Sequence, residues 1–106
     1  MKKIDFVLMS LQHKFVSDYF RNGKTKYEKC TNTKDIFMML DFNDWKDTLS
    51  YYGYSNRFIQ TEVKNQSGRF VRLLNKLVSM ADEYNWGAEM IEIMKQDSVV
   101  NKSNNN

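Results

Sequence analysis

Apolar side chains recur at helical spacing from Arg69 to Tyr84, and this repeat constrains the fold more than any other feature. Within that window the large apolar residues return every three or four positions, as they do when one face of an α-helix is buried. The repeat consists of Phe70, Val71, Leu73, Leu74, Leu77, Val78, Met80, Ala81 and Tyr84. The sequence therefore predicts an all-α protein in which this segment is the central core helix.

The same spacing recurs in other parts of the chain, separated by residues that suit helix ends. The further helices are predicted over residues 3–22, 34–40, 44–52, 56–65 and 88–96. Thr33, Asp41 or Asn43, and Ser55 are the expected N-caps, and Gly23 and Gly53 are the expected stops. Residues 24–29 are expected to form a basic loop or a short strand. The pattern predicts a bundle of about five helices.

The length of the chain, 106 residues, suits one domain with a modest core. We expect this domain to cover residues 1–97, and the Ser/Asn-rich segment 98–106 to be a disordered tail because of its composition. The predicted core consists of Phe15, Trp45, Leu49, Phe58, Phe70, Leu74, Leu77 and Ile91.

Cysteine usage and hydropathy indicate a cytoplasmic protein. Cys30 is the only cysteine, so an internal disulfide framework is excluded and a reducing compartment is the natural expectation. The apolar run after Met1 is cut short by Ser10 and His13, and no small-residue cleavage site follows it. Since no segment approaches the roughly 20 apolar residues of a membrane span, we expect no contact with a membrane.

The sequence offers little that could carry out catalysis. The chemically active candidates are His13, Cys30, the pair Asp44 and Asp47, and the pair Asp82 and Glu83. We expect His13 to be a partly buried structural imidazole, Cys30 to be an inert buried thiol and the carboxylates to face solvent. One histidine and one cysteine cannot complete a zinc site, and no glycine-rich phosphate loop is present. The prediction is a non-enzymatic protein without catalytic residues, metal site or cofactor.

Basic side chains gather in two segments, although the formal net charge of the whole chain is only +3. Such clusters suit contacts with the phosphates of nucleic acid. The candidate contact residues are Arg21, Lys24, Lys26 and Lys29 in the first segment and Arg57, Gln60, Lys64, Arg69 and Arg72 in the second. Tyr27 lies within the first segment and could stack on an unpaired base, as in single-strand and RNA binding. A solvated basic loop gives the same pattern.

The second segment follows a corner that resembles a helix-turn-helix. Residues 44–52 and 56–65 are the two expected helices, joined by the turn Gly53-Tyr54-Ser55. This resemblance implies a DNA-reading second helix whose outer face comprises Arg57, Gln60, Thr61 and Lys64. A plain helical corner with a solvated face is the alternative. Residues 69–74 could also form the strand of a wing, although the helical repeat opposes this. The corner favours DNA, whereas the aromatic residue of the first basic segment favours RNA. DNA and RNA are therefore nearly equal as expected ligands.

Protein binding is the competing hypothesis. The aromatic residues exceed what a small core needs, and exposed tyrosines such as Tyr51 and Tyr54 are favoured interface anchors. Under this hypothesis the chain is an inhibitor or adaptor that blocks a host enzyme, alone or together with nucleic acid. Frequent Lys, Asn, Ile, Tyr and Phe with few alanines indicate an AT-rich gene, which suits a phage or mobile-element origin.

Overall fold

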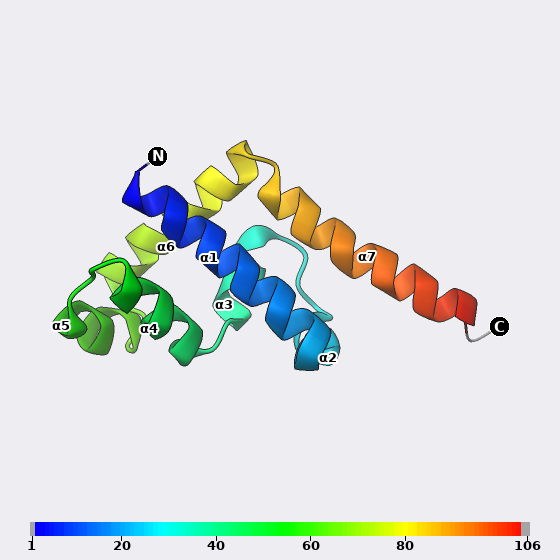
Figure 1. Ribbon diagram of the computed structural model, residues 1–106, viewed down its shortest axis with the longest axis horizontal. Helices are drawn as coiled ribbons and strands as arrows, with labels where there is room; N and C mark the ends of the chain where they lie inside the picture. The colour runs from blue at the N-terminus through cyan, green and yellow to red at the C-terminus, as the bar shows by residue number, and fades with distance from the viewer. Residues whose placement is uncertain (1, 105–106) are drawn as a thin grey trace.

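The computed structural model describes residues 2–104 of the chain, with side chains described as far as Gln96. Within residues 2–104 there are helices and short connections but no strand (Figure 1). The helices are α1 (Lys3–Asp18), α2 (Lys24–Tyr27), α3 (Thr33–Met39), α4 (Phe42–Tyr51), α5 (Asn56–Phe58), α6 (Gly68–Glu83) and α7 (Trp86–Asn104). Two single π-helical turns, η1 (Tyr19–Gly23) and η2 (Ile59–Val63), extend α1 and α5. The predicted all-α class is confirmed.

The helices pack around α1 and α6, which cross at the centre of the molecule. Figure 1 shows α1 running across the front, with α4 and α5 toward one end and α2 at the other. α1 contacts α3, α4, α6 and α7, and α6 also contacts η2, α3 and α7. These contacts cover one face of α6 and account for its long apolar repeat.

The predicted core is largely confirmed. Buried members are Phe15, Trp45, Leu49, Phe70, Leu74 and Leu77, whereas Phe58 and Ile91 are partly buried and pack against the core. The indole of Trp45 meets the ring of Phe70 edge-on, with 4.9 Å between centroids. Its Nε1–H donates a hydrogen bond of 3.2 Å to the carbonyl of Phe37, which satisfies the polar atom of a buried tryptophan.

The predicted helix ends around α4 and α5 are confirmed. Asp41 caps α4 in a capping box with Asp44, and the Ser55 hydroxyl accepts a bond from the amide of Phe58 at the start of α5. Gly53 takes a φ of 87°, a left-handed conformation that favours glycine. The corner between these helices is therefore encoded by local chemistry.

The N-cap of α3 is Asn32, and the prediction of Thr33 was wrong by one residue. The Asn32 side chain accepts a hydrogen bond from the amide of Asp35. Thr33 is the first helical residue, is buried, and donates its hydroxyl proton to Asp82 at 2.7 Å. A distant partner on α6 therefore uses the hydroxyl that the sequence suggested for capping.

The expected helix stop at Gly23 was also wrong. The backbone continues as helix through η1 into α2, so residues 24–27 form neither a loop nor a strand. Gly23 is buried with a φ of −106°, and a Cβ there would lie 2.8 Å from the ring of Tyr27. Glycine at this position therefore allows close packing of Tyr27 and does not end the helix.

α7 is the longest helix, and its backbone is helical as far as Asn104. Side chains after Gln96 lie outside the described residues, as do Asn105 and Asn106. The expected domain boundary at residue 97 and the disordered tail over 98–106 therefore stay predictions. Within the described chain, no helix combines the length and apolar character needed to cross a membrane.

Candidate nucleic-acid interface

The second basic segment occupies α5, η2 and the first half of α6. Arg57, Lys64, Arg69, Arg72 and Lys76 are all exposed. None of the five forms an ion pair with another residue whose side chain is described. We call these five residues the basic face. Their charges are available to an external anion.

Three members of the basic face share one side of α6. Arg69, Arg72 and Lys76 stand at positions i, i+3 and i+7, so their side chains leave the helix in similar directions. Phe70 and Leu74, on the opposite side, are buried in the core. The three basic positions span roughly 10 Å along the helix axis, at about 1.5 Å per residue. Lys76 was missing from the predicted contact residues, although the helical spacing places it beside Arg69 and Arg72.

Glu62 is the single acidic residue between Arg57 and Lys76. It is partly buried, and its carboxylate accepts a hydrogen bond from the hydroxyl of Ser67, which lies just before α6. Because Glu62 is held in this local contact, it pairs with none of the basic side chains around it. The segment therefore presents a net positive charge to solvent.

The helix-turn-helix-like corner exists, but its second helix is not straight. Ile59 and Val63 are buried, and η2 packs against α4, as the sequence predicts. The π turn adds one residue, which offsets positions on either side of it by about 100° relative to a straight α-helix. Gln60 is partly buried, and the Thr61 hydroxyl donates to the carbonyl of Arg57 at 2.6 Å. The expected outer stripe of this helix is therefore broken.

The wing alternative was wrong, because residues 69–74 belong to α6. The repeat of buried residues Phe70, Leu74 and Leu77 continues without interruption through this segment. Gln66 has a φ of 53° and directs the chain from η2 into α6. The turn that was considered as the start of a wing therefore joins two helices.

The first basic segment lies at the opposite end of α1 from α5 (Figure 1). Lys26 does not extend freely into solvent, because its Nζ lies 2.9 Å from a carboxylate oxygen of Asp18 and 3.0 Å from one of Asp41. Arg21, Lys24 and Lys29 are exposed. The two basic segments thus form separate surfaces, and the first includes nearby carboxylates.

Base stacking on Tyr27 was a wrong prediction, since this ring is fully buried. It packs edge-on against Phe15, with 5.0 Å between centroids. Its hydroxyl donates a 2.7 Å hydrogen bond to the Asp18 carboxylate that also binds Lys26. Tyr27 is a core residue that joins α2 to the end of α1.

This cluster shifts the pKa values of its members. Burial alone would raise the pKa of Asp18, but the hydrogen bonds from Lys26 and Tyr27 outweigh it and hold the pKa below its ordinary value. Burial would lower the pKa of Lys26, whereas its bonds to Asp18 and Asp41 raise it overall. For Tyr27, burial and then the bond to Asp18 raise the pKa far above its ordinary value. The neutral phenol is therefore the form that the fold favours.

We expect Tyr27→Phe to reduce the alkaline sensitivity of the fold. A raised pKa in the folded state contributes stability that is fully present below the unfolded value, near 10, and is lost as pH rises above it. For one phenol this loss is about 1.4 kcal/mol per pH unit. Denaturant unfolding at a series of pH values should show that the wild type is more stable than Tyr27→Phe at pH 7 and that this advantage shrinks above about pH 10. A constant difference across that range would contradict a neutral, buried Tyr27.

The residues considered for catalysis are scattered. His13 is exposed on α1, so the expected partly buried imidazole was wrong. Burial, followed by the nearby charge of Asp35, raises the pKa of the half-buried Cys30 thiol. Asp44 belongs to the capping box of α4, and Asp82 accepts the bond from Thr33. Among the described side chains, no three His, Cys, Asp or Glu residues come close enough to hold a metal ion.

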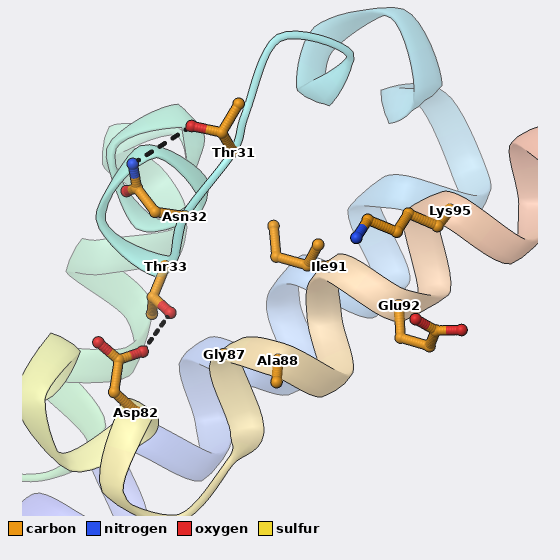
Figure 2. Close-up of a pocket in the computed structure, with 9 residues that line it drawn as sticks. All are labelled: Thr31, Asn32, Thr33, Asp82, Gly87, Ala88, Ile91, Glu92 and Lys95. Atoms are coloured by element: carbon orange, nitrogen blue, oxygen red, sulfur yellow. Dashed lines mark hydrogen bonds between the residues drawn. The ribbon is translucent and has the colours of Figure 1, made fainter.

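A pocket of about 350 Å³ lies where the start of α3 meets α6 and α7 (Figure 2). Figure 2 shows Thr33 and Asp82 bonded to each other on one side and the side chain of Lys95 reaching across the other. Gly87, in the first turn of α7, passes so close to Thr33 and Asp82 that a side chain would collide with both. The pocket is therefore built on a tight junction of three helices.

The two tyrosines predicted as interface anchors have different surroundings. Tyr51, in the last turn of α4, has 82% of its surface exposed. Tyr54 is partly buried, because the Lys3 ammonium lies 4.1 Å from its ring centroid and Phe58 packs beside it at 5.7 Å. Tyr54 thus connects Lys3 at the start of α1 to Phe58 at the corner, whereas the side chain of Tyr51 is accessible from solvent.

Of the surfaces described above, the basic face is the one whose side chains most directly suit the binding of an anionic ligand. Guanidinium and ammonium groups bind phosphate oxygens by charge-assisted hydrogen bonds, and they do so most readily when no protein carboxylate competes. In comparisons with known proteins, no family model matches this sequence, and no curated protein or solved structure matches the chain.

Proposed function

We propose that the protein binds nucleic acid through its basic face and acts as a binding protein without chemistry of its own. The observation that supports this is a group of five exposed cations that form no ion pair with any side chain from residue 2 to residue 96: Arg57, Lys64, Arg69, Arg72 and Lys76. Counterions held by nucleic acid are released when such cations bind its phosphates, which supplies most of the affinity of non-specific complexes.

Duplex DNA is the ligand that this geometry favours. The aromatic ring expected to stack on unpaired bases, Tyr27, is buried and unavailable. Arg69, Arg72 and Lys76 form a straight stripe on a rigid helix, which suits the regularly spaced phosphates of a duplex. The broken face around Gln60 is less suited to reading base edges. We therefore propose contact mainly with the DNA backbone.

Fluorescence anisotropy with a labelled DNA duplex of about 20 base pairs and a single-stranded RNA of equal length tests this proposal. The duplex should bind with a dissociation constant below about 100 μM at low salt and should lose affinity steeply between roughly 50 and 200 mM salt. The RNA should bind more weakly. If neither ligand binds below about 100 μM at low salt, the protein is not a nucleic-acid-binding protein.

Arg57→Ala and Gln60→Ala should separate backbone binding from base reading. Loss of one phosphate contact at Arg57 should lower the slope of log affinity against log salt by about 0.9. Gln60→Ala should leave both the affinity and the preference among duplex sequences unchanged, because Gln60 is partly buried in η2. Anisotropy titrations on duplexes of different sequence measure both quantities, and thermal melts check that each variant folds. If Gln60→Ala weakens base discrimination by about 1–3 kcal/mol, the protein reads sequence through the corner.

A further inference from the structure

The pocket where α3, α6 and α7 meet contains none of the basic-face residues (Figure 2). Its volume of about 350 Å³ falls within the range of about 300–1,000 Å³ that is usual for small-molecule sites. Gly87 and the bonded pair of Thr33 and Asp82 close one end, where the three helices meet most tightly. The pocket is therefore held in shape by packing and has room for a small ligand.

One stripe of α7 forms a wall of this pocket. Ala88, Ile91 and Lys95 stand at positions i, i+3 and i+7, so their side chains leave the helix in similar directions, and all three line the pocket. The first two offer aliphatic surface, and the third ends in an ammonium group. The wall therefore changes from apolar near the junction to cationic two turns farther along the helix.

The ammonium group of Lys95 is available to a ligand. Side chains of a helix lean toward its N-terminus, so that of Lys95 leans back toward the junction, and Figure 2 shows it reaching across the pocket. Lys95 forms no ion pair with any side chain from residue 2 to residue 96. Glu92, which also lines the pocket, accepts a hydrogen bond from Gln96. An anionic group in the pocket would therefore have Lys95 as its partner.

A carboxylate lies at the opposite end of the pocket. Asp82 is exposed, and one of its oxygens accepts the 2.7 Å hydrogen bond from Thr33. A carboxylate has about four acceptor sites, so Asp82 can accept further bonds. Thr33 donates its only hydroxyl proton to Asp82, so the two side chains offer acceptors and no donor to a ligand. This end of the pocket therefore suits the ammonium group of a ligand.

We propose that this pocket binds a small linear amino carboxylate. Its carboxylate pairs with Lys95, its ammonium group with Asp82, and its methylene chain lies against Ala88 and Ile91. Gly87 and Lys95 are about 12 Å apart along the helix axis, and the Lys95 side chain spans part of this distance. In δ-aminovalerate the methylene chain holds the two charges roughly 6 Å apart. A molecule of this length can join both ends of the pocket, whereas the two charges of free glycine are too close together to do so.

Isothermal titration calorimetry with δ-aminovalerate, valerate, amylamine and free glycine tests this proposal. δ-Aminovalerate should bind with a dissociation constant below about 1 mM. Valerate and amylamine each lack one of the two charged groups, and free glycine lacks the chain between them, so all three should bind at least about tenfold more weakly. Binding of δ-aminovalerate weaker than about 1 mM, or equal binding of valerate and δ-aminovalerate, would overturn the proposal.

Lys95→Gln and Lys46→Gln separate the pocket from positive charge in general. Lys46 is exposed on α4 and does not line the pocket. Lys95→Gln should weaken δ-aminovalerate binding at least about tenfold, to no more than that of amylamine, because the carboxylate loses its partner. Lys46→Gln should leave the binding unchanged. Both positions are exposed, so thermal melts of the two variants should match that of the wild type. Undiminished binding of δ-aminovalerate by the folded Lys95→Gln variant would refute the site.

Discussion

Replacing Gly87 with alanine should lower the free energy of unfolding by about 2–3 kcal/mol. A Cβ at this position would overlap the Thr33 hydroxyl and lie 2.7 Å from a carboxylate oxygen of Asp82. These two groups are bonded to each other and join α3 to α6 beneath the first turn of α7 (Figure 2). The added methyl group must therefore either separate the helices or break this bond and leave a buried hydroxyl without a partner. Urea unfolding followed by circular dichroism measures the loss.

Gly68→Ala is the matched control for this substitution. Gly68 is the first residue of α6, as Gly87 is the second residue of α7, but a Cβ at Gly68 would meet no atom within 4 Å. Alanine should leave stability unchanged or raise it by about 0.4–1 kcal/mol, because it restricts the unfolded chain. Equal stabilities for Gly87→Ala and wild type would show that the junction of α3, α6 and α7 is not tightly packed.

The parts of the fold that follow from local chemistry could be predicted from the sequence. α6 was predicted over 69–84 and runs over Gly68–Glu83, because its burial pattern repeats regularly within one helix. Gly53 and Ser55 were predicted at the corner, since a left-handed turn and an N-cap depend on the residue itself and its immediate neighbours. The class of the fold follows from such signals.

The errors arose where distant residues decide the structure. Gly23 resembles a helix stop, but the buried ring of Tyr27 packs on it and the helix continues. Thr33 resembles an N-cap, but its hydroxyl bonds Asp82, which is 49 residues away. Neither contact has a local signature, and the π turns η1 and η2 likewise have none. Tertiary packing therefore overrides the local signal at these positions.

The candidate site shows the same division. Exposure of Arg69 and Arg72 follows from the helical repeat, which would also have identified Lys76. The engagement of Lys26 by Asp18 and Asp41 could not be predicted, since it depends on how α2 lies against the end of α1 and the N-cap of α4. Burial of Tyr27 depends on the packing of α2 against the end of α1. As a result, the structure leaves the second basic segment as the stronger candidate.

The central claim is that the basic face, and not positive charge in general, binds nucleic acid. Two triple variants test this on equal terms, because each removes three positive charges from a chain of net charge +3. One replaces Arg69, Arg72 and Lys76 with glutamine on α6. The other replaces Arg21, Lys24 and Lys29 with glutamine at the opposite end of α1. Thermal melts should first establish that both variants are folded.

The measurement is duplex DNA affinity by fluorescence anisotropy as a function of salt. We expect the α6 variant to bind roughly 100- to 1,000-fold more weakly than the wild type at about 0.1 M salt, with its salt slope reduced by about 2.7 through the loss of three phosphate contacts. The control variant should keep the wild-type slope and lose less than about tenfold in affinity, because its charges lie near α2, at the opposite end of α1 from α5, and are expected to make no phosphate contact. Equal losses in the two variants, or a greater loss in the control, would contradict the assignment of binding to the basic face.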